Sequence, residues 1–403
     1  MATDASPNVG CSHAQANSTH TDHVRTNLKQ LEPDVRCRIS AGSGGRIALV
    51  LLERFDPQPA HVGQGMLLSH NTVTANATPV GSSQFGDLFL FVHDDFVKLG
   101  QIFLPMRDSI EYFLFATIHW LARHMSFRNA ERTGALLGQA VFSCTNFRKS
   151  VTLENLRHAF PEKTPAERLA IARGAYRNYG IALMEFLWAS DKPPEVLIPI
   201  VRIVNPEVMH AALARNRGVL FLSGHFGAWE FLVTASSLQF GVRVATLVQH
   251  QRNAKIDACI DSIRRRFGNE TIPMGVASRR VLTALAQNRI VPLLGDQSGP
   301  KEAVFVEFFG RPAATHRGVA AFSLKSGAPI VMGFLVRQSD GTYTLTLEEV
   351  DQHDLTGYTE ENIVELTRRH VAVLERWIRK HPDHWLWMHK RWKHTPYYEQ
   401  RHA

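Results

Sequence analysis

The chain has 403 residues, 44% hydrophobic and 20% charged, which is enough for one large α/β domain with appendages or for two smaller domains. Its formal net charge of +8 favours acidic partners such as an anionic membrane, nucleic acid, or a phosphorylated or acidic-protein substrate, and charge alone does not choose among them. The four cysteines are scattered without a Cys-x-x-Cys pair, which argues against a zinc ribbon or a disulfide scaffold.

Residues 1–100 differ from the rest of the chain in composition and in the pattern of their apolar residues. They begin with a polar, aperiodic stretch that extends to about residue 45. Two short apolar runs follow, Ile47–Leu52 and Leu88–Val92, and both are candidate strands. We interpret residues 1–100 as a poorly structured or accessory N-terminal extension. The alternative is that the natural start of the protein lies downstream, near Met106.

The apolar run Tyr112–Ala122 comes nearest to a membrane span. It has 11 residues, fewer than the roughly 18 that a span requires, and His119 interrupts it. Charged residues flank the run on both sides. On these residues alone three interpretations remain open: a buried helix, an interfacial anchor, or a marginal span whose ends snorkel.

From residue 107 onward helical and strand signals alternate. Thr164–Ser190 is predicted to be a helix, with Thr164 as N-cap, Pro165 at the first helical position and apolar residues at helical spacing. Further helices are expected at Lys255–Phe267, Val276–Gln287 and Glu360–Lys380, and strands at Gly218–Gly224, Val242–Val248, Ile290–Leu294, Pro329–Val336 and Thr342–Val350. This interleaving predicts an α/β fold with a mixed, largely parallel sheet flanked by helices.

The candidate chemistry lies in GHFGAWE, directly after the strand predicted at Gly218–Gly224. Here His225 precedes the carboxylate of Glu230 by five residues. The spacing is weak evidence by itself, because the chain contains two further pairs of this kind, His370–Glu375 and His394–Glu399. Those two fall in an amphipathic helix and in a polar tail, where solvated side chains are expected.

The local context separates His225 and Glu230 from the other pairs. Positions i and i+5 do not meet on a straight helix, but they can meet at a strand-to-helix turn that Gly224 and Gly227 allow to bend. His225 is then expected to act as general base toward a hydroxyl, with Glu230 fixing its tautomer and stabilising the imidazolium. The alternative is a structural histidine that caps a helix. The sequence lacks the nucleophile elbow, phosphate loop, zincin and dinucleotide motifs.

The block GVLFLSGHFGAWEF resembles the active-site block of the bacterial lipid A biosynthesis acyltransferases, the late lauroyl- and myristoyl-transferases of the lysophospholipid-acyltransferase-like superfamily. Three further blocks resemble those of this family in order and spacing: Glu154–Arg168, Leu293–Gly318 and Trp385–Pro396. The resemblance covers roughly residues 107–397.

The resemblance implies a glycerolipid-acyltransferase-like α/β fold with an N-terminal membrane-associated helix. Residues 107–125 would form the anchoring or interfacial helix and residues 126–397 the acyltransferase domain. The implied reaction moves a fatty acyl group from an acyl-carrier-protein or CoA thioester to a hydroxyl of a lipid A precursor or related glycolipid. It would take place at the cytoplasmic face of the bacterial inner membrane, without a cofactor, a metal or a nucleic-acid partner.

The resemblance also assigns residues to the site. His225 and Glu230 match the catalytic pair of the family. The substrate-binding positions that it implies are Arg264, chosen from three consecutive arginines, Asp296, Gly310, Arg317 and Arg391. Arg264 would stabilise the thioester oxyanion or hold a phosphate, and Asp296 would orient or help to bind substrate; the alternative for the arginines is a solvated helix face.

The basic C-terminal segment 390–393 combines cations with Trp392. It is compatible with lipid head groups, the phosphates of an acceptor, an acidic carrier protein or nucleic acid. A further alternative is that Trp385, Trp387 and Trp392 pack this segment on the core. For the whole chain, the alternative to catalysis is a peripheral protein that binds anionic lipid. The sequence does not reveal the acyl length or the acceptor.

Overall fold

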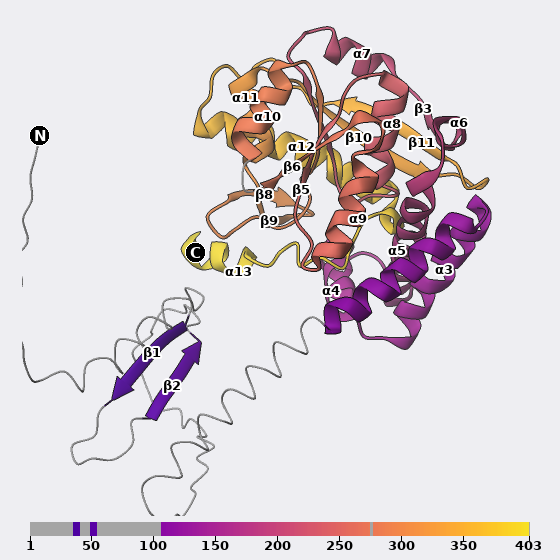
Figure 1. The fold of residues 1–403 in the computed structure, drawn as a ribbon. Helices are drawn as coiled ribbons and strands as arrows, with labels where there is room; N and C mark the ends of the chain where they lie inside the picture. The colour runs from indigo at the N-terminus through magenta and orange to yellow at the C-terminus, as the bar shows by residue number, and fades with distance from the viewer. Residues whose placement is uncertain (1–34, 41–48, 55–105, 275–276, 403) are drawn as a thin grey trace, which may run out of the picture. The chain divides into compact units, whose positions relative to one another are not determined.

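The structure, a computed structural model, describes residues 35–40, 49–54, 106–274 and 277–402. The chain divides into two compact units, Met1–Ser82 and Ser83–Ala403. The second unit contains every residue that the sequence assigned to a site, and Figure 1 shows its elements in chain order.

The described part of the first unit is a two-stranded antiparallel ribbon. Strand β1 (Val35–Ser40) pairs with strand β2 (Leu49–Arg54), and Cys37 lies opposite Leu52. Strand β2 overlaps the strand predicted at Ile47–Leu52. The run Leu88–Val92 lies outside the described residues. The extent of an N-terminal extension therefore stays a prediction.

A five-stranded sheet forms the centre of the second unit, in the order β3-β11-β10-β4-β7. Its strands are β3 (Val201–Ile203), β11 (Tyr343–Glu349), β10 (Ile330–Arg337), β4 (Val219–Ser223) and β7 (Ile290–Leu294). Strands β10 and β11 run antiparallel, whereas the other three neighbouring pairs are parallel. The prediction of a mixed, largely parallel sheet is confirmed.

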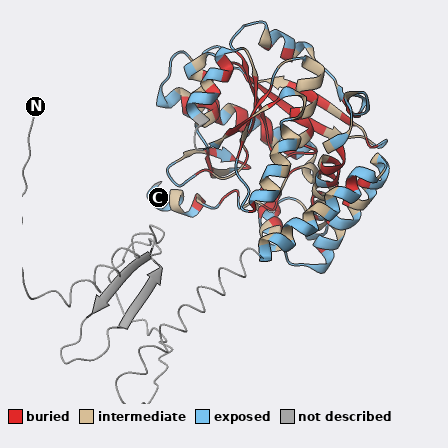
Figure 2. Cartoon of the chain, in the orientation of Figure 1, coloured by how far each residue is buried: buried red, intermediate tan, exposed pale blue. Residues whose placement is uncertain are grey.

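Helices cover both faces of this sheet. Along β4, Leu220 and Leu222 belong to the apolar cluster that includes residues of α12 (Glu360–Lys380). Phe221 belongs to a second cluster, with residues of α8 (Glu230–Phe240). Because successive side chains of a strand point to opposite faces, α12 and α8 lie on opposite sides of the sheet (Figure 1). Figure 2 shows the buried residues concentrated in the strands between these helices.

Smaller elements extend the sheet and surround it. Strand β5 (Ala245–Val248) pairs in parallel with β6 (Glu270–Pro273), and a bridge from Val244 to Ile290 joins this pair to β7. Strands β8 (Val304–Phe308) and β9 (Arg311–Thr315) form an antiparallel hairpin. The helices around the sheet include α4 (Lys149–Ala159), α6 (Pro194–Leu197), α7 (Glu207–Leu213), α9 (Ala254–Arg264), α10 (Ala277–Ala286), α11 (Gly318–Ser326) and α13 (Thr395–His402).

Helix α5 (Pro165–Trp188) begins as the sequence predicted. The hydroxyl of Thr164 accepts a hydrogen bond from the backbone N–H of Glu167, and the Glu167 carboxylate accepts one from the backbone N–H of Thr164. These reciprocal bonds satisfy two donors that a helix start leaves without partners.

Helix α3 (Phe127–Cys144) packs along α5 at very short range. A Cβ on Gly134 would lie 2.5 Å from the carbonyl oxygen of Gly180, and a Cβ on Gly138 would overlap the carbonyl oxygen of Tyr176. The two helix backbones are therefore in direct contact through their glycines.

A further helix occupies residues 106–124. It contains the apolar run Tyr112–Ala122, of which Ala122 is fully buried whereas Phe113, Leu114 and Trp120 are exposed. Among the described residues, no helix is both long and apolar enough to cross a membrane.

Candidate active site

The turn after β4 places His225 at the carboxyl end of a central strand. Gly227 has a φ of +58°, and a Cβ at this position would overlap the carbonyl oxygen of Leu335, so the turn requires glycine. The backbone N–H of Gly227 donates to His384 at 2.8 Å, and the N–H of Leu386 donates to the carbonyl of His225 at 3.0 Å. The C-terminal segment therefore holds this turn in place.

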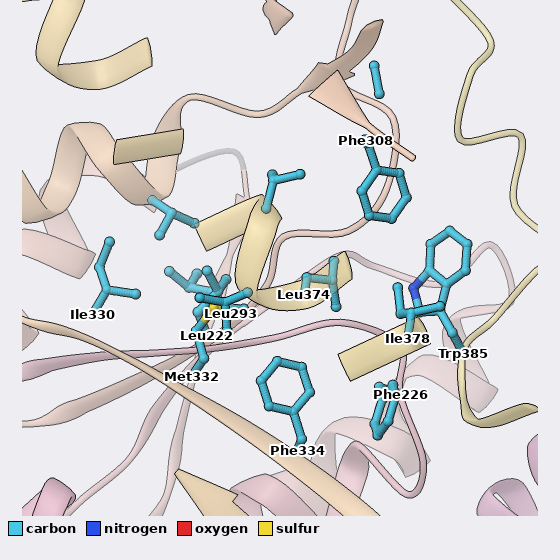
Figure 3. Packing of buried hydrophobic residues seen from close by; sticks show 14 of the residues in the cluster. Leu222, Phe226, Leu293, Phe308, Ile330, Met332, Phe334, Leu374, Ile378 and Trp385 are labelled. Carbon is cyan, nitrogen blue, oxygen red and sulfur yellow. The ribbon is translucent and has the colours of Figure 1, made fainter. Parts of the chain in front are cut away.

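Packing of Phe226 in the hydrophobic core also fixes this turn. The side chain of Phe226 is fully buried and contacts the ring of Phe334, with 5.5 Å between ring centroids. The backbone of Phe226 forms an isolated bridge with Trp385. Figure 3 shows Phe226 in the apolar cluster near Ile378 and Trp385. His225 thus lies between strand β4 and the buried Phe226, and both restrict the backbone conformation of His225.

Asp296 holds the imidazole of His225. Its Oδ1 lies 2.8 Å from His225 Nδ1, and its Oδ2 accepts the backbone N–H of His225 at 2.8 Å. The indole N–H of Trp385 donates to the same Oδ2 at 2.9 Å. A Cβ on Gly224 would lie 3.2 Å from Asp296 Cβ, so this glycine gives the carboxylate room to approach.

These contacts set the protonation of both groups. Burial raises the pKa of Asp296, but the charge and hydrogen bonds of His225, together with the Trp385 N–H, lower it to about 2. Burial lowers the pKa of His225, but the Asp296 charge and hydrogen bond raise it further, so the His225 pKa lies above its ordinary value. With Nδ1–H donated to an ionised carboxylate, the neutral imidazole presents Nε2 as a proton acceptor.

Glu230 binds Arg264 instead of His225. Arg264, the last residue of α9, donates from Nη2 to Oε1 at 2.5 Å and from Nε to Oε2 at 3.1 Å. Glu230 is the first residue of α8, where the helix dipole favours a carboxylate. The prediction that Glu230 fixes the tautomer of His225 is wrong, because Asp296 occupies Nδ1. The Glu230 charge still helps to raise the pKa of His225, and its importance for catalysis stays a prediction.

A largely apolar pocket of about 880 Å³ lies beside His225. Its polar lining includes His225, Glu230, Arg264 and Gln297. The rest is mainly aliphatic and aromatic, supplied by residues 106–124, α3 and α5 and by the C-terminal segment: Phe115, Ile118, Leu137, Val141, Tyr179, Leu183, Met184, Leu187, Leu386 and Met388. The arrangement can hold a long apolar group with one polar end against the imidazole.

The sequence profile of the bacterial lipid A biosynthesis acyltransferases matches residues 101–394, which is most of the chain. The chain belongs to this family. The lipid A biosynthesis palmitoleoyltransferase of Escherichia coli (strain K12) is 25% identical over 309 residues, covering 74% of this chain and 96% of that protein. The lauroyltransferase of the same organism is 24% identical over 283 residues, covering 69% and 89%, and the myristoyltransferase is 25% identical over 240 residues, covering 59% and 73%.

Family membership confirms the resemblance drawn from the four sequence blocks, and two of these blocks meet at the site of this acyltransferase. The block Leu293–Gly318 supplies Asp296 and Gln297, and the block Trp385–Pro396 supplies Trp385 and His389. The backbone N–H of Ser298 donates to His389 Nε2 at 2.9 Å. Sequence reasoning missed the roles of Gln297, Trp385 and His389, and their only signal was their place inside these blocks.

Of the predicted substrate-binding residues, Arg264 lines the pocket, Asp296 lies behind His225, and the other three lie elsewhere in the acyltransferase. Gly310 forms the turn between β8 and β9, with a φ of +71°. Arg317 is exposed and forms an ion pair with Glu360. Arg391 is fully buried, where it donates to the carbonyl of Ala314 at 2.5 Å, and burial lowers its pKa to about 10. In the structure Gly310 therefore serves a turn, Arg317 a surface ion pair and Arg391 a contact in the core. A role in substrate binding stays a prediction for all three.

The tryptophans of the C-terminal segment pack on the core, which was one of the alternatives for this segment. Trp385, Trp387 and Trp392 are all buried. Among the residues that the structure describes, no cluster of three His, Cys, Asp or Glu side chains could hold a metal ion.

Proposed function

We propose that this acyltransferase moves a fatty acyl group from an acyl-carrier-protein or CoA thioester to a hydroxyl of a lipid A precursor or a related glycolipid. The observation that carries the proposal is the His225–Asp296 pair, whose imidazole lines a large, mainly apolar pocket. Family membership supports the lipid acceptor and the reaction type. In this proposal the donor substrate carries an apolar chain on an activated thioester carbonyl, and the acceptor substrate supplies a glycolipid hydroxyl.

In the proposed reaction His225 acts as general base. Its Nε2 takes the proton of the acceptor hydroxyl while the oxygen forms a bond to the thioester carbonyl carbon. The carbon–sulfur bond of the tetrahedral intermediate then breaks, and the imidazolium returns the proton to the leaving thiolate. The buried charge of Asp296 stabilises the imidazolium that forms between the two steps. These steps require no cofactor and no covalent enzyme intermediate.

We assign Glu230 and Arg264 to the polar wall around the reacting groups. Arg264 donates hydrogen bonds from Nε and Nη2 to the two carboxylate oxygens of Glu230. This ion pair fixes the end of α9 against the start of α8. Arg264 also lines the pocket, and the planar guanidinium of arginine is well suited to bind the phosphate of a donor or acceptor. Arg264 is therefore proposed as a substrate-binding residue, and Glu230 as the residue that positions it.

The rim of the pocket supports a membrane-associated enzyme. Six residues that line the pocket are also exposed large hydrophobics: Ile118, Leu137, Val141, Phe147, Leu183 and Leu294. Outside the pocket, Phe113 of residues 106–124 and Leu136 of α3 are 69% and 71% exposed. An apolar rim of this kind is typical of a surface that meets lipid. We propose peripheral docking of this rim on the cytoplasmic face of the bacterial inner membrane.

The decisive experiment is acyl transfer by the full-length chain in detergent. A series of acyl-carrier-protein and CoA thioesters is offered with a lipid A precursor, and product is detected by mass. Wild type is compared with His225→Ala and with His353→Ala, a matched control in an exposed loop. Loss of the base should lower the rate by about 10²–10⁴-fold, whereas the control should match wild type.

Two outcomes would contradict the proposal. Activity of His225→Ala equal to wild type would exclude His225 as the base. Folded wild type that binds anionic lipid but transfers no acyl group from any donor would favour the alternative of a non-catalytic lipid-binding protein.

A further inference from the structure

Gln297 is a polar residue of the pocket that the proposed mechanism has not used. Its side-chain Nε2 lies 3.5 Å from His225 Nε2, the nitrogen that accepts the proton. Among the described residues, the side-chain amide has no other hydrogen-bond partner, and it lines the same pocket as His225 and Arg264. A donor that is held this close to the reacting nitrogen, and that the protein leaves otherwise unused, points to a role toward the substrate.

The hydrogen bond between Gln297 and His225 is weak. A separation of 3.5 Å is longer than the usual range for a bond donated by N–H. Because Nδ1–H of His225 is directed at Asp296, its Nε2 carries a lone pair, and the amide N–H of Gln297 points toward it. The acceptor hydroxyl must bind to this same lone pair, which releases the amide N–H for another acceptor nearby.

The backbone on both sides of Gln297 is fixed. Asp296 before it is bound by two atoms of His225 and by the indole of Trp385. Ser298 after it donates its backbone N–H to His389 and forms a bridge with Thr315. The side chain therefore extends into the pocket from a backbone that is held at neighbouring positions, which is how a preorganised catalytic donor is built.

We propose that the side-chain amide of Gln297 stabilises the oxyanion of the tetrahedral intermediate. This inference rests on the proposed acyl transfer. When the acceptor oxygen bonds to the thioester carbon and its proton moves to His225 Nε2, the electron pair of the carbonyl double bond moves to the carbonyl oxygen. The N–H of Gln297 donates to that oxygen until the carbon–sulfur bond breaks, the carbonyl re-forms and the thiolate takes the proton from the imidazolium.

Arg264 is the other donor near this position, and it suits the role less well. Two of its nitrogens are committed to the Glu230 carboxylate, which also neutralises its charge. Gln297 gives up only one long contact to His225 when substrate enters. Of the two roles that the sequence left open for Arg264, oxyanion stabilisation or phosphate binding, we therefore keep phosphate binding for Arg264 and assign the oxyanion to Gln297.

The test compares Gln297→Met and Gln297→Ala with wild type in the transfer assay. Methionine keeps the length of the side chain but removes the amide. Both variants should lower kcat by about 10²–10³-fold, the cost of losing one oxyanion donor, with KM for both substrates within about threefold. The control is Gln287→Ala, an exposed glutamine before the amino end of β7, which should leave kcat within about twofold.

A binding measurement separates transition-state stabilisation from simple substrate binding. The dissociation constant of a donor thioester is measured for His225→Ala with and without Gln297→Met, because neither protein turns the donor over. We expect equal constants, and thermal melts of all variants should match wild type.

Three results would overturn the inference. One is a kcat of Gln297→Met within about threefold of wild type. Another is a loss that appears wholly as raised KM and weaker donor binding, which would make Gln297 a ground-state contact. If wild type itself transfers no acyl group, the proposed function fails and the inference fails with it, whereas active wild type with an active Gln297→Met variant overturns the inference alone.

Discussion

Asp296 concentrates several interactions in one buried carboxylate. It accepts hydrogen bonds from two atoms of His225 and from Trp385, and its pKa of about 2 keeps it ionised. We predict that Asp296→Asn lowers kcat by about 10²–10⁴-fold, because an amide neither enforces the tautomer of the imidazole nor stabilises its cation. The acyl-transfer assay measures the loss, and a KM near that of wild type would show that substrate binding persists.

The same variant should change the pH dependence of the reaction. As the proposed base, His225 must be neutral, so kcat/KM should fall as the pH falls through the pKa of His225, which is raised above the ordinary value of about 6.5. In Asp296→Asn the charge that raises this pKa is gone while the burial that lowers it remains. The acidic limb of the profile should therefore move to lower pH. A limb that stays in place would show that another group titrates there.

The sequence singled out the histidine that we propose as the base, but it did not reveal the group that orients this histidine. The strand before His225 and the two glycines around it are local signals, so they could be read from one short segment. The carboxylate at Nδ1 comes from a residue 71 positions away, across two parallel strands, and periodicity does not reveal such a contact. Glu230 looked like the partner because it is near in sequence. The start of α8 turns its side chain toward Arg264 instead.

At the scale of elements, the contact between α3 and α5 sets the width of the pocket. Gly138 and Gly180 line the pocket, and a Cβ on Gly138 would overlap the backbone of Tyr176. We predict that Gly138→Ala forces the two helices apart and lowers the free energy of unfolding by about 1–3 kcal/mol. Urea unfolding measures this loss, and the transfer assay should show weaker discrimination among donor chain lengths.

The matched control for this variant is Gly318→Ala at the start of α11. A Cβ there would meet only Phe322, at an ordinary distance of 3.7 Å, so the change should leave stability equal or slightly higher because alanine favours a helix. If Gly138→Ala unfolds at the same urea concentration as wild type, the helices are not held by backbone contact.

Elements with local signals were predicted well, and those held by distant partners were not. The cap at Thr164 and the apolar periodicity of Glu360–Lys380 placed α5 and α12, and the bounds of β7 agree with the prediction. Helix α3 was not predicted by itself. Leu136 and Leu137 are exposed, so the apolar residues of this helix are not confined to its buried face and the helical pattern is less distinct. The hairpin β8–β9 was read as part of a motif and not as strands, although its two strands pair directly across the short turn at Phe309 and Gly310.

At the scale of the whole molecule, the exposed apolar residues gather on elements that also build the pocket. Residues 106–124, α3 and α5 supply most of the large hydrophobics that stay exposed. Arg132 lies one helical turn before Leu136 and is exposed, so the face combines apolar side chains with a cation. Such a face suits an anionic bilayer, because apolar side chains enter the interface and each nearby cation adds about 1 kcal/mol.

We predict that the double variant Phe113→Asp, Leu136→Asp weakens binding to anionic vesicles by at least about tenfold. Burying one such side chain contributes about 1.5–3 kcal/mol, and two introduced charges also repel the anionic surface. Co-sedimentation with vesicles at increasing salt measures the effect. Neither residue lines the pocket, so transfer to a detergent-dispersed acceptor should persist.

The control for this prediction is Val364→Asp on α12, an exposed apolar residue of a helix on the other side of the sheet from α8. It adds one charge of the same sign without touching the elements around the pocket, and vesicle binding should match wild type. Equal weakening by the control would mean that net charge alone governs binding. Undiminished binding of the double variant would instead show that a different surface meets the membrane. The lipid substrate would then have to reach the pocket from solution and not directly from the bilayer.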